Sequence, residues 1–325
     1  MSVAWWMLLA ALAAAGTWLA RRYALARALL DAPGERRAHE VPTPRGGGIA
    51  IVAAMLVASL VLLARAGAAW PVMAAFTAGL VAVAVVGWID DHRPLSARLR
   101  LCVHAGAALG FALALGGTTG QWAWAGMAGL GIVALVNIWN FMDGIDALAA
   151  SQAALVAAAV GAALPGIAGA LAWSLSAACV GFLPFNLPRA RIFMGDVGSG
   201  ALGYVLGALL VMAAMSLPSR SMLWLLPPSA FLVDAGLTLA RRVLRGEAWW
   251  TAHAQHAYQG WARRVGHGPV TLAYAGWTVA AVAIVWWLRE ASTGFILASV
   301  TAWYTAAAFF WGLLQARNAA ASRRT

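Results

Sequence analysis

Two adjacent carboxylates, Asp90 and Asp91, follow an apolar run that ends at Ile89. Neighbouring carboxylates repel each other, and a proton or a hard divalent cation such as Mg²⁺ would relieve that repulsion. Magnesium bound together with a diphosphate substrate would suit such a pair. On its own, the pair is equally compatible with a solvated loop whose acids are balanced by Arg93 and Arg98.

Four amide and carboxylate side chains recur at every third residue further along the chain. They are Asn137, Asn140, Asp143 and Asp146. At the end of a helix this spacing places neighbouring members on one face. Such groups can ligate a metal ion or recognise the edge of a nucleotide. Helix capping with a turn at Gly144 would explain one aspartate, but not four polar residues in register.

A third polar segment, rich in glycine, precedes another apolar run. It reads Phe193-Met194-Gly195-Asp196-Val197-Gly198-Ser199. Its small residues would let the backbone approach a phosphate at a helix N-terminus, where Asp196 could face a metal ion. The same pattern also describes an ordinary turn followed by a helix cap.

Two histidines, His253 and His256, lie in a segment that also holds five arginines. No cysteine or third nearby ligand completes a zinc site. Phosphate binding or proton transfer beside the arginines suits the pair better. A histidine pair in a loop is also commonly incidental.

The elements that must position these groups are strongly apolar. Of the 325 residues, 63% are hydrophobic and only 10% are charged, and the mean hydropathy is +0.78. This excess of apolar residues predicts an all-α integral membrane protein, a single polytopic domain over residues 1–325. About eleven runs are long enough to cross a bilayer: 3–20, 47–64, 71–89, 99–116, 121–140, 147–164, 167–184, 198–216, 222–240, 269–288 and 293–313.

The charges predict the orientation of these spans. The net charge of +11 comes from arginine, because the chain has no lysine. All arginines except Arg65, Arg220 and Arg289 fall on one side of the eleven spans, and this side is cytoplasmic by the positive-inside rule. The N-terminus is then periplasmic and the C-terminus cytoplasmic. The cytoplasmic loops, about 21–46, 90–98, 141–146, 185–197 and 241–268, hold all four polar clusters, so we expect the active site on this face.

The order and placement of these clusters resemble the polyprenyl-phosphate N-acetylhexosamine-1-phosphate transferases of glycosyltransferase family 4. The resemblance begins at His39-Glu40-Val41-Pro42-Thr43-Pro44-Arg45-Gly46-Gly47-Gly48 and extends to about Gln259. Within the family, the chain is most similar to bacterial enzymes that initiate O-antigen or related surface polysaccharides.

The resemblance implies a role for each cluster. It assigns acceptor activation near the metal to Asp90 and Asp91, and diphosphate binding to His253 and His256. It places Mg²⁺, or Mn²⁺ instead, on Asp196 with Asn140. Substrate binding is expected at Asp143, Asp146, Phe193, Arg45 and His39, with Phe193 stacking on the nucleobase and an arginine replacing a lysine of the peptidoglycan enzyme.

The implied reaction transfers an N-acetylhexosamine 1-phosphate from a UDP-sugar to undecaprenyl phosphate and releases UMP, in the inner membrane of a bacterium. Membrane lipids are expected partners, nucleic acid is not, and a homodimer is compatible with the sequence. Direct attack and a route through a phospho-aspartate both stay open. One alternative is the muramyl-pentapeptide transferase of peptidoglycan synthesis, although that enzyme has three consecutive histidines where this chain has His253-Ala254-Gln255-His256. A secondary transporter is the alternative of another class, but no internal repeat or midplane charge cluster supports it.

Overall fold

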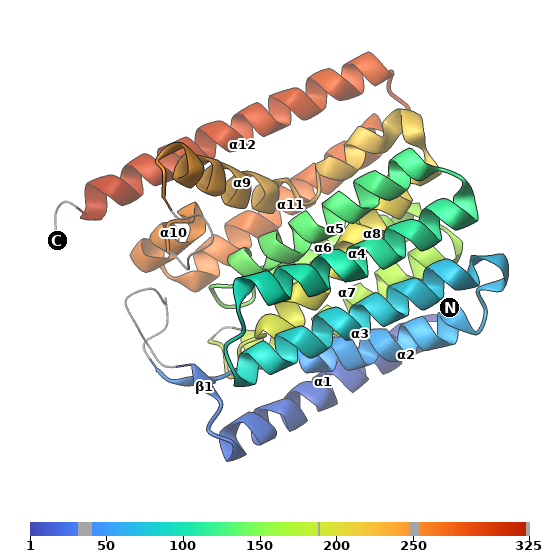
Figure 1. Cartoon of the computed structure of the whole chain (residues 1–325). Helices are drawn as coiled ribbons and strands as arrows, with labels where there is room; N and C mark the ends of the chain where they lie inside the picture. Colours follow the sequence, from blue (N-terminus) through green and yellow to red (C-terminus); the bar gives the residue numbers. More distant parts are fainter. Residues whose placement is uncertain (32–40, 188, 248–253, 323–325) are drawn as a thin grey trace.

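The computed structural model describes residues 1–31, 41–187, 189–247 and 254–322. The described chain is helical apart from a pair of two-residue antiparallel strands, in which Leu30 pairs with Pro44 and Asp31 with Thr43. Figure 1 shows the helices as one bundle. The elements are α1 (Val3–Ala26), β1 (Leu30–Asp31), β2 (Thr43–Pro44), α2 (Ile49–Leu63), η1 (Gly67–Ala69), α3 (Trp70–His92), α4 (Ala97–Thr119), α5 (Trp122–Met142), α6 (Leu148–Ala163), α7 (Gly166–Asn186), α8 (Asp196–Ser216), η2 (Pro218–Leu225), α9 (Ser229–Leu244), α10 (Ala257–Val265), α11 (His267–Leu288) and α12 (Thr293–Ser322).

The lengths of these helices confirm an all-α integral membrane protein. Among the described residues, eight helices are long and apolar enough to cross a membrane, or nine if the bent pair η2–α9 is one span. The two remaining predicted runs are the shorter apolar helices α2, with 15 residues, and α6, with 16 residues. At about 1.5 Å per residue, neither reaches the roughly 30 Å of a hydrocarbon core. The count of eleven spans and their orientation therefore stay predictions.

The structure adds detail to two of the predicted segments. The run 222–240 is bent, because η2 and α9 meet at an angle of 70°. Pro227 and Pro228 lie at the bend, where proline lacks the backbone donor of a continuous helix and restricts the residue before it. The loop predicted from residue 90 also begins later: α3 continues to His92, so Asp90 and Asp91 lie in its last turn.

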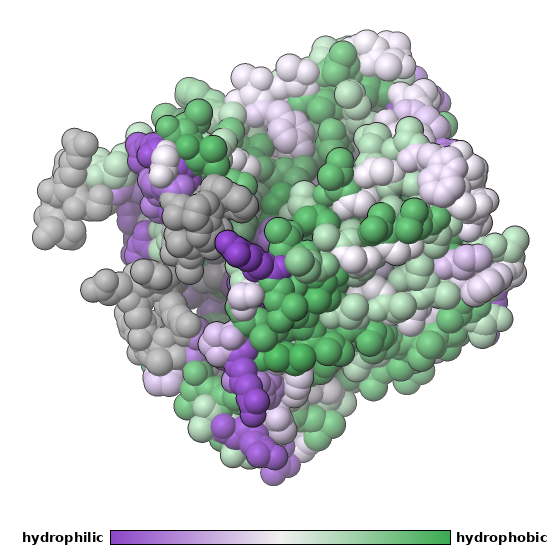
Figure 2. Space-filling view, in the orientation of Figure 1, coloured by the Kyte–Doolittle hydropathy of each residue, from purple (hydrophilic) through white to green (hydrophobic). Residues whose placement is uncertain are grey.

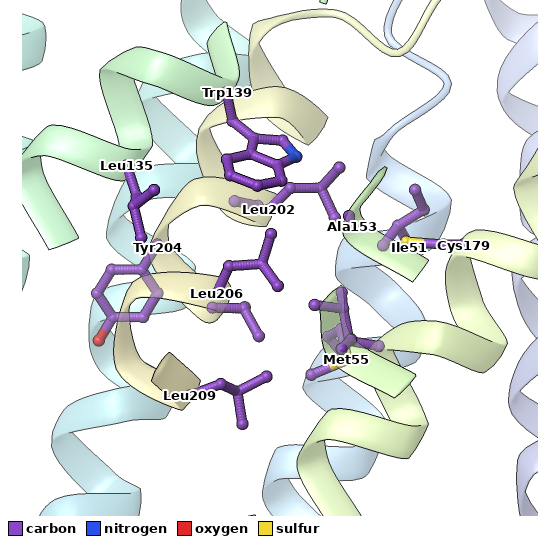
Figure 3. Packing of buried hydrophobic residues seen from close by; sticks show 14 of the residues in the cluster. Ile51, Met55, Leu135, Trp139, Ala153, Cys179, Leu202, Tyr204, Leu206 and Leu209 are labelled. Atoms are coloured by element: carbon purple, nitrogen blue, oxygen red, sulfur yellow. The ribbon is translucent and has the colours of Figure 1, made fainter. Parts of the chain in front are cut away.

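The core is organised around α8, which packs against α2, α3, α5, α6 and α7. Figure 3 shows side chains of α8 such as Tyr204 and Leu206 among those of neighbouring helices, including Trp139 of α5. Glycines allow this proximity: a Cβ atom at Gly203 would lie 2.4 Å from the carbonyl oxygen of Leu135. Small residues at helix contacts are typical of membrane bundles, where close van der Waals packing holds helices together. This packing fixes the N-terminal end of α8 against α3 and α5.

One end of the bundle carries the polar segments. In Figure 1 the α1–β1 connection, the α3–α4 turn and α10 lie at the same end. Figure 2 shows hydrophilic side chains gathered at this end, while the flank of the bundle on view is mainly hydrophobic. The N-terminus of α8 also lies here, because it contacts the last turn of α3.

Candidate functional site

The glycine-rich segment after β2 lies directly on the segment that precedes α8. The backbone N–H of Gly47 donates to the carbonyl of Phe193 at 2.9 Å, and that of Gly48 donates to Met194 at 2.8 Å. The N–H of Phe193 in turn donates to the carbonyl of Pro44 at 2.8 Å. A Cβ atom at Gly48 would lie 2.3 Å from the Cα of Gly198, so only glycine fits this contact. Two motifs about 150 residues apart thus form one structural unit.

Asp91 connects α3 to the N-terminus of α8. Its two carboxylate oxygens accept hydrogen bonds from the backbone N–H groups of Asp196, at 3.0 Å, and Val197, at 3.1 Å. These N–H groups have no partner within α8, and a carboxylate there is further stabilised by the helix dipole. The carboxylate fits because Gly195 has no side chain and a φ of +76°; a Cβ atom there would lie 2.6 Å from it. Arg45 donates to the backbone carbonyl of Asp91 and so also contacts this unit.

Asp90 faces a second set of partners. Its carboxylate accepts from the backbone N–H of Leu95 at 2.5 Å and forms an ion pair with Nη1 of Arg100 at 2.6 Å. The same Nη1 lies 3.1 Å from Asp196, so Arg100 bridges carboxylates of α3 and α8. On the other side of Asp196, the side-chain amide of Asn140 donates to the carboxylate at 2.6 Å. Asp90, Asp196, Asn140 and Arg100 therefore form one connected polar cluster at the ends of α3, α4, α5 and α8.

Arg100 is a site residue that the sequence reasoning did not single out. Three arginines follow the aspartate pair, and the neighbouring Arg93 and Arg98 are exposed, whereas Arg100 is half-buried. Ser96 caps α4 by accepting from the N–H of Leu99 at 3.2 Å, and this start of the helix directs Arg100 toward Asp90. A capping serine four residues before an arginine was the available signal.

Asp143 lies at the C-terminal end of α5 and is half-buried. Burial and the negative charges of Asp196 and Asp91 raise the pKa of its carboxyl to about 8. The raised pKa therefore reflects burial first and the two neighbouring carboxylates second. Within the described ranges, no group of three His, Cys, Asp or Glu side chains has the geometry of a metal site. The donor chemistry nevertheless fits Mg²⁺, which prefers carboxylate oxygens and binds with only one or two of them.

Asp146 makes its contacts with residues outside this cluster. One carboxylate oxygen accepts from the N–H of Ala190 at 3.1 Å, and the other lies 3.1 Å from Nδ1 of His267. Its backbone carbonyl accepts from the hydroxyl of Thr271 at 2.8 Å. These contacts join the loop before α8 to the start of α11. Substrate binding by Asp146 stays a prediction.

His256 is buried at the N-terminus of α10, where it forms a capping box with Gln259. Asp234 of α9 fixes the same helix end, accepting from the N–H groups of Ala257 at 2.8 Å and Tyr258 at 3.0 Å. The hydroxyl of Tyr258 donates to the carbonyl of Phe141 at 3.0 Å, next to Asn140. The structure thus holds α10 against the end of α5, beside the acidic cluster.

The remaining predicted residues divide into two groups. Phe193 is half-buried and joins the cluster region through its backbone, so nucleobase stacking stays a prediction. His39 and His253 lie outside the residues that the structure describes. The roles predicted for these two histidines stay predictions.

The fold and the site define a multi-pass membrane protein with a cluster of carboxylates, an amide and an arginine at one end of its helices. Residues 73–214 match the pattern of the family described as "Glycosyl transferase family 4". The chain is 30% identical to the decaprenyl-phosphate N-acetylglucosaminephosphotransferase of Mycobacterium tuberculosis over 70% of its own length and 67% of the relative's. The chain belongs to this family, the polyprenyl-phosphate hexosamine-1-phosphate transferases.

Other relatives carry related names. The phospho-N-acetylmuramoyl-pentapeptide-transferase of Synechococcus elongatus is 32% identical over 62% of this chain and 63% of its own length. A probable undecaprenyl-phosphate N-acetylglucosaminyl 1-phosphate transferase of Bacillus subtilis is 31% identical over 59% of this chain and 58% of its own length. The chain thus spans less than two thirds of the length of these two proteins.

Proposed function

We propose that the protein transfers an N-acetylhexosamine 1-phosphate from a UDP-sugar to undecaprenyl phosphate. The products are UMP and a sugar linked to the lipid through a diphosphate. The observation that carries this proposal is the cluster of Asp90, Asn140 and Asp196 around Arg100, at the ends of membrane helices. A polar site at this level can meet a lipid phosphate from the bilayer and a nucleotide from the aqueous phase. The membership of family 4 supports the same reaction class.

The proposed metal is Mg²⁺, or Mn²⁺ in its place. Asp196 would hold the ion together with Asp143. Asn140 would orient Asp196, because its amide N–H already donates to that carboxylate. When bound, the ion supplies stabilisation of the negative charge that develops on the departing UMP phosphate.

Asp90 is the better candidate for the base of the two adjacent aspartates. Both carboxylate oxygens of Asp91 accept from backbone N–H groups of α8, which favours a positioning role. In Asp90, one oxygen accepts from the backbone of Leu95 and the other pairs with the side chain of Arg100 within the polar cluster. Asp90 would accept the remaining proton of the acceptor phosphate. That proton has a pKa near about 6, so little base strength is required. The acceptor oxygen then attacks the sugar-bearing phosphorus of the donor, and the bond from this phosphorus to the UMP oxygen breaks.

Arg100, Arg45 and the histidine segment are the proposed partners of the phosphate oxygens. Arg100 already bridges two carboxylates, and charge-assisted hydrogen bonds from arginine suit phosphate equally well. His256 lies at the start of α10, which Tyr258 holds against Phe141 next to Asn140. This arrangement supports a contribution of α10 to the site.

We place the protein in the inner membrane of a bacterium, where it would initiate O-antigen or another surface polysaccharide. The segment His253-Ala254-Gln255-His256 favours this branch over the muramyl-pentapeptide transferases, which the resemblance associates with three consecutive histidines. The relatives of Mycobacterium tuberculosis and Bacillus subtilis, both named for N-acetylglucosamine, support an N-acetylhexosamine donor.

The test is UMP release by the purified full chain in lipid nanodiscs. Undecaprenyl phosphate, Mg²⁺ and a panel of UDP-N-acetylhexosamines are supplied, with UDP-MurNAc-pentapeptide as a further donor. We expect release that requires the lipid and stops with EDTA. The Asp90→Asn variant should lose activity, whereas Glu290→Gln, an exposed change, should keep it. Release only with UDP-MurNAc-pentapeptide would move the protein to the peptidoglycan branch, and no release with any donor from folded protein would contradict the proposal.

A further inference from the structure

A cavity lies among the last four helices, and no residue of the acidic cluster lines it. Its volume is about 420 Å³, within the range of about 300–1,000 Å³ that small-molecule pockets occupy. Its walls come from α9, α10, α11 and α12. None of the residues that hold the acidic cluster, on α3, α4, α5 and α8, lines it. The reaction proposed above therefore does not account for this cavity.

The walls of the cavity are apolar and aromatic. They include Trp261, Trp277, Phe310 and Trp311. Two of the indole N–H groups donate hydrogen bonds to residues of α9. Trp277 of α11 donates to Ser229 at 3.1 Å, and Trp311 of α12 donates to Thr238 at 3.4 Å. The rings therefore offer the cavity carbon surface. This lining suits a hydrocarbon chain.

Two charged residues border the cavity, and they differ in their contacts. The carboxylate of Asp234 is buried and accepts from the hydroxyl of Tyr274 at 2.7 Å as well as from two backbone N–H groups of α10. Arg317 of α12 is exposed and makes no hydrogen bond or ion pair with the part of the chain that the structure describes. A second arginine lies near this end, because Arg241 donates to Gln315, two residues before Arg317, at 3.2 Å. The cavity thus combines an apolar interior with an exposed arginine at its border.

We propose that this cavity binds an acyl chain of an anionic phospholipid of the bilayer, with the lipid phosphate at Arg317. A polytopic membrane protein is surrounded by such lipids, and an arginine near an anionic headgroup favours its binding. A polyprenyl acceptor in position to react has its phosphate at Asp90 and Asp196, which do not line the cavity, so its phosphate does not lie at Arg317. A phospholipid is therefore the occupant that the position of the arginine favours.

A bound lipid would also stabilise the neighbouring helix α10. Asp234 and Ala257 both line the cavity, and they are joined by a hydrogen bond of 2.8 Å at the start of α10. From there, Tyr258 contacts the end of α5 through the carbonyl of Phe141. Filling the cavity should therefore raise the thermal stability of the region that holds His256.

The experiment compares phosphatidylglycerol with phosphatidylcholine of identical acyl chains, added to the delipidated full chain in detergent. Native mass spectrometry counts bound lipids, and a melting curve reports stability. Ala273→Phe places a ring in the cavity from an exposed position on α11, and Ala280→Phe is the matched control on the same helix, outside the cavity. Arg317→Gln removes the positive charge, with Arg289→Gln at the other end of α11 as its control.

For the wild-type chain we expect one phosphatidylglycerol to be retained in preference to phosphatidylcholine, with a higher melting temperature. Ala273→Phe should abolish this retention, and Arg317→Gln should lower the preference about fivefold, the effect of one arginine near an anionic headgroup. Both controls should bind as the wild type does. Equal retention of the two lipids, or unchanged retention by Ala273→Phe, would overturn the proposal. Displacement of phosphatidylglycerol from the cavity by undecaprenyl phosphate would assign the site to the acceptor instead.

Discussion

The carboxylate of Asp91, in the last turn of α3, accepts from the backbone N–H of Asp196, the first residue of α8, at 3.0 Å. The same carboxylate accepts from Val197 at 3.1 Å, so a residue of one helix caps the start of another. The adjacent Asp90 points to a different partner, the guanidinium of Arg100. Two neighbouring aspartates thus have different tasks, one in positioning α8 and one in the polar cluster that α8 completes.

The first prediction separates these two tasks. Asp91→Asn should destabilise the protein by about 1–3 kcal/mol, because an amide oxygen replaces a charged acceptor of two N–H groups. Asp90→Asn should leave the melting temperature within a few degrees of the wild type and lower UMP release by about 10²–10⁴-fold, the usual contribution of a positioned base. Melting curves and UMP release measured on both variants check this. A stable but inactive Asp91→Asn together with an unstable Asp90→Asn would contradict the assignment.

The second prediction concerns the close contact between α2 and α8. A Cβ atom at Gly48 would lie 2.3 Å from the Cα of Gly198, a backbone atom that cannot move aside without shifting the helix. Gly48→Ala should therefore cost about 1–3 kcal/mol of stability and reduce UMP release. Gly106→Ala on α4 is the control, because a Cβ atom there meets nothing within 4 Å, and it should be neutral or stabilise by up to about 1 kcal/mol. Equal melting temperatures for Gly48→Ala and Gly106→Ala would argue against the contact.

Arg100 provides the third prediction. Removing it in Arg100→Ala leaves Asp90 and Asp196 without their shared cation, which should cost about 1–2 kcal/mol for a half-buried pair. Mg²⁺ should then raise the melting temperature more in this variant than in the wild type, because the ion replaces part of the lost positive charge. Arg98→Ala, an exposed change two residues earlier on α4, should melt as the wild type does with and without Mg²⁺. If Mg²⁺ raises the melting temperatures of Arg98→Ala and Arg100→Ala equally, Arg100 does not neutralise the charge of the carboxylates at the proposed metal site.

The fourth prediction follows from the raised pKa of Asp143, about 8 in the folded protein. The unfolded value is about 3.9, so the folded state binds this proton more tightly. The resulting stabilisation is complete below about pH 4 and is lost as the pH rises toward and through about 8. In EDTA, the melting temperature of the wild type should therefore fall more steeply between pH 6 and pH 9 than that of Asp143→Asn. Parallel melting curves for the two proteins across this range would show that Asp143 is ionised throughout.

Several features of the fold follow from the sequence because they depend on local composition. The apolar runs predicted the helices, since apolar segments in a bilayer must satisfy their own backbone hydrogen bonds. A single helix coincides with each run except 222–240, which η2 and α9 share. The polar residues of the cluster were recognisable because Asp90, Asn140 and Asp196 interrupt or end such runs. The bend between η2 and α9 lies at Pro227 and Pro228, within the run 222–240 that the sequence predicted as one span.

What the sequence by itself determined about this protein is therefore its class: helices for a membrane, with polar residues at their ends. The tertiary structure alone decided which of those residues meet. Arg100 and not Arg98 reaches Asp90, and Asp91 rather than a residue of α8 caps that helix. These choices depend on the relative rotation and depth of α3, α4 and α8, which are set by packing between segments about a hundred residues apart. A periodic pattern along one helix identifies its apolar residues but carries no information on the rotation of its neighbour.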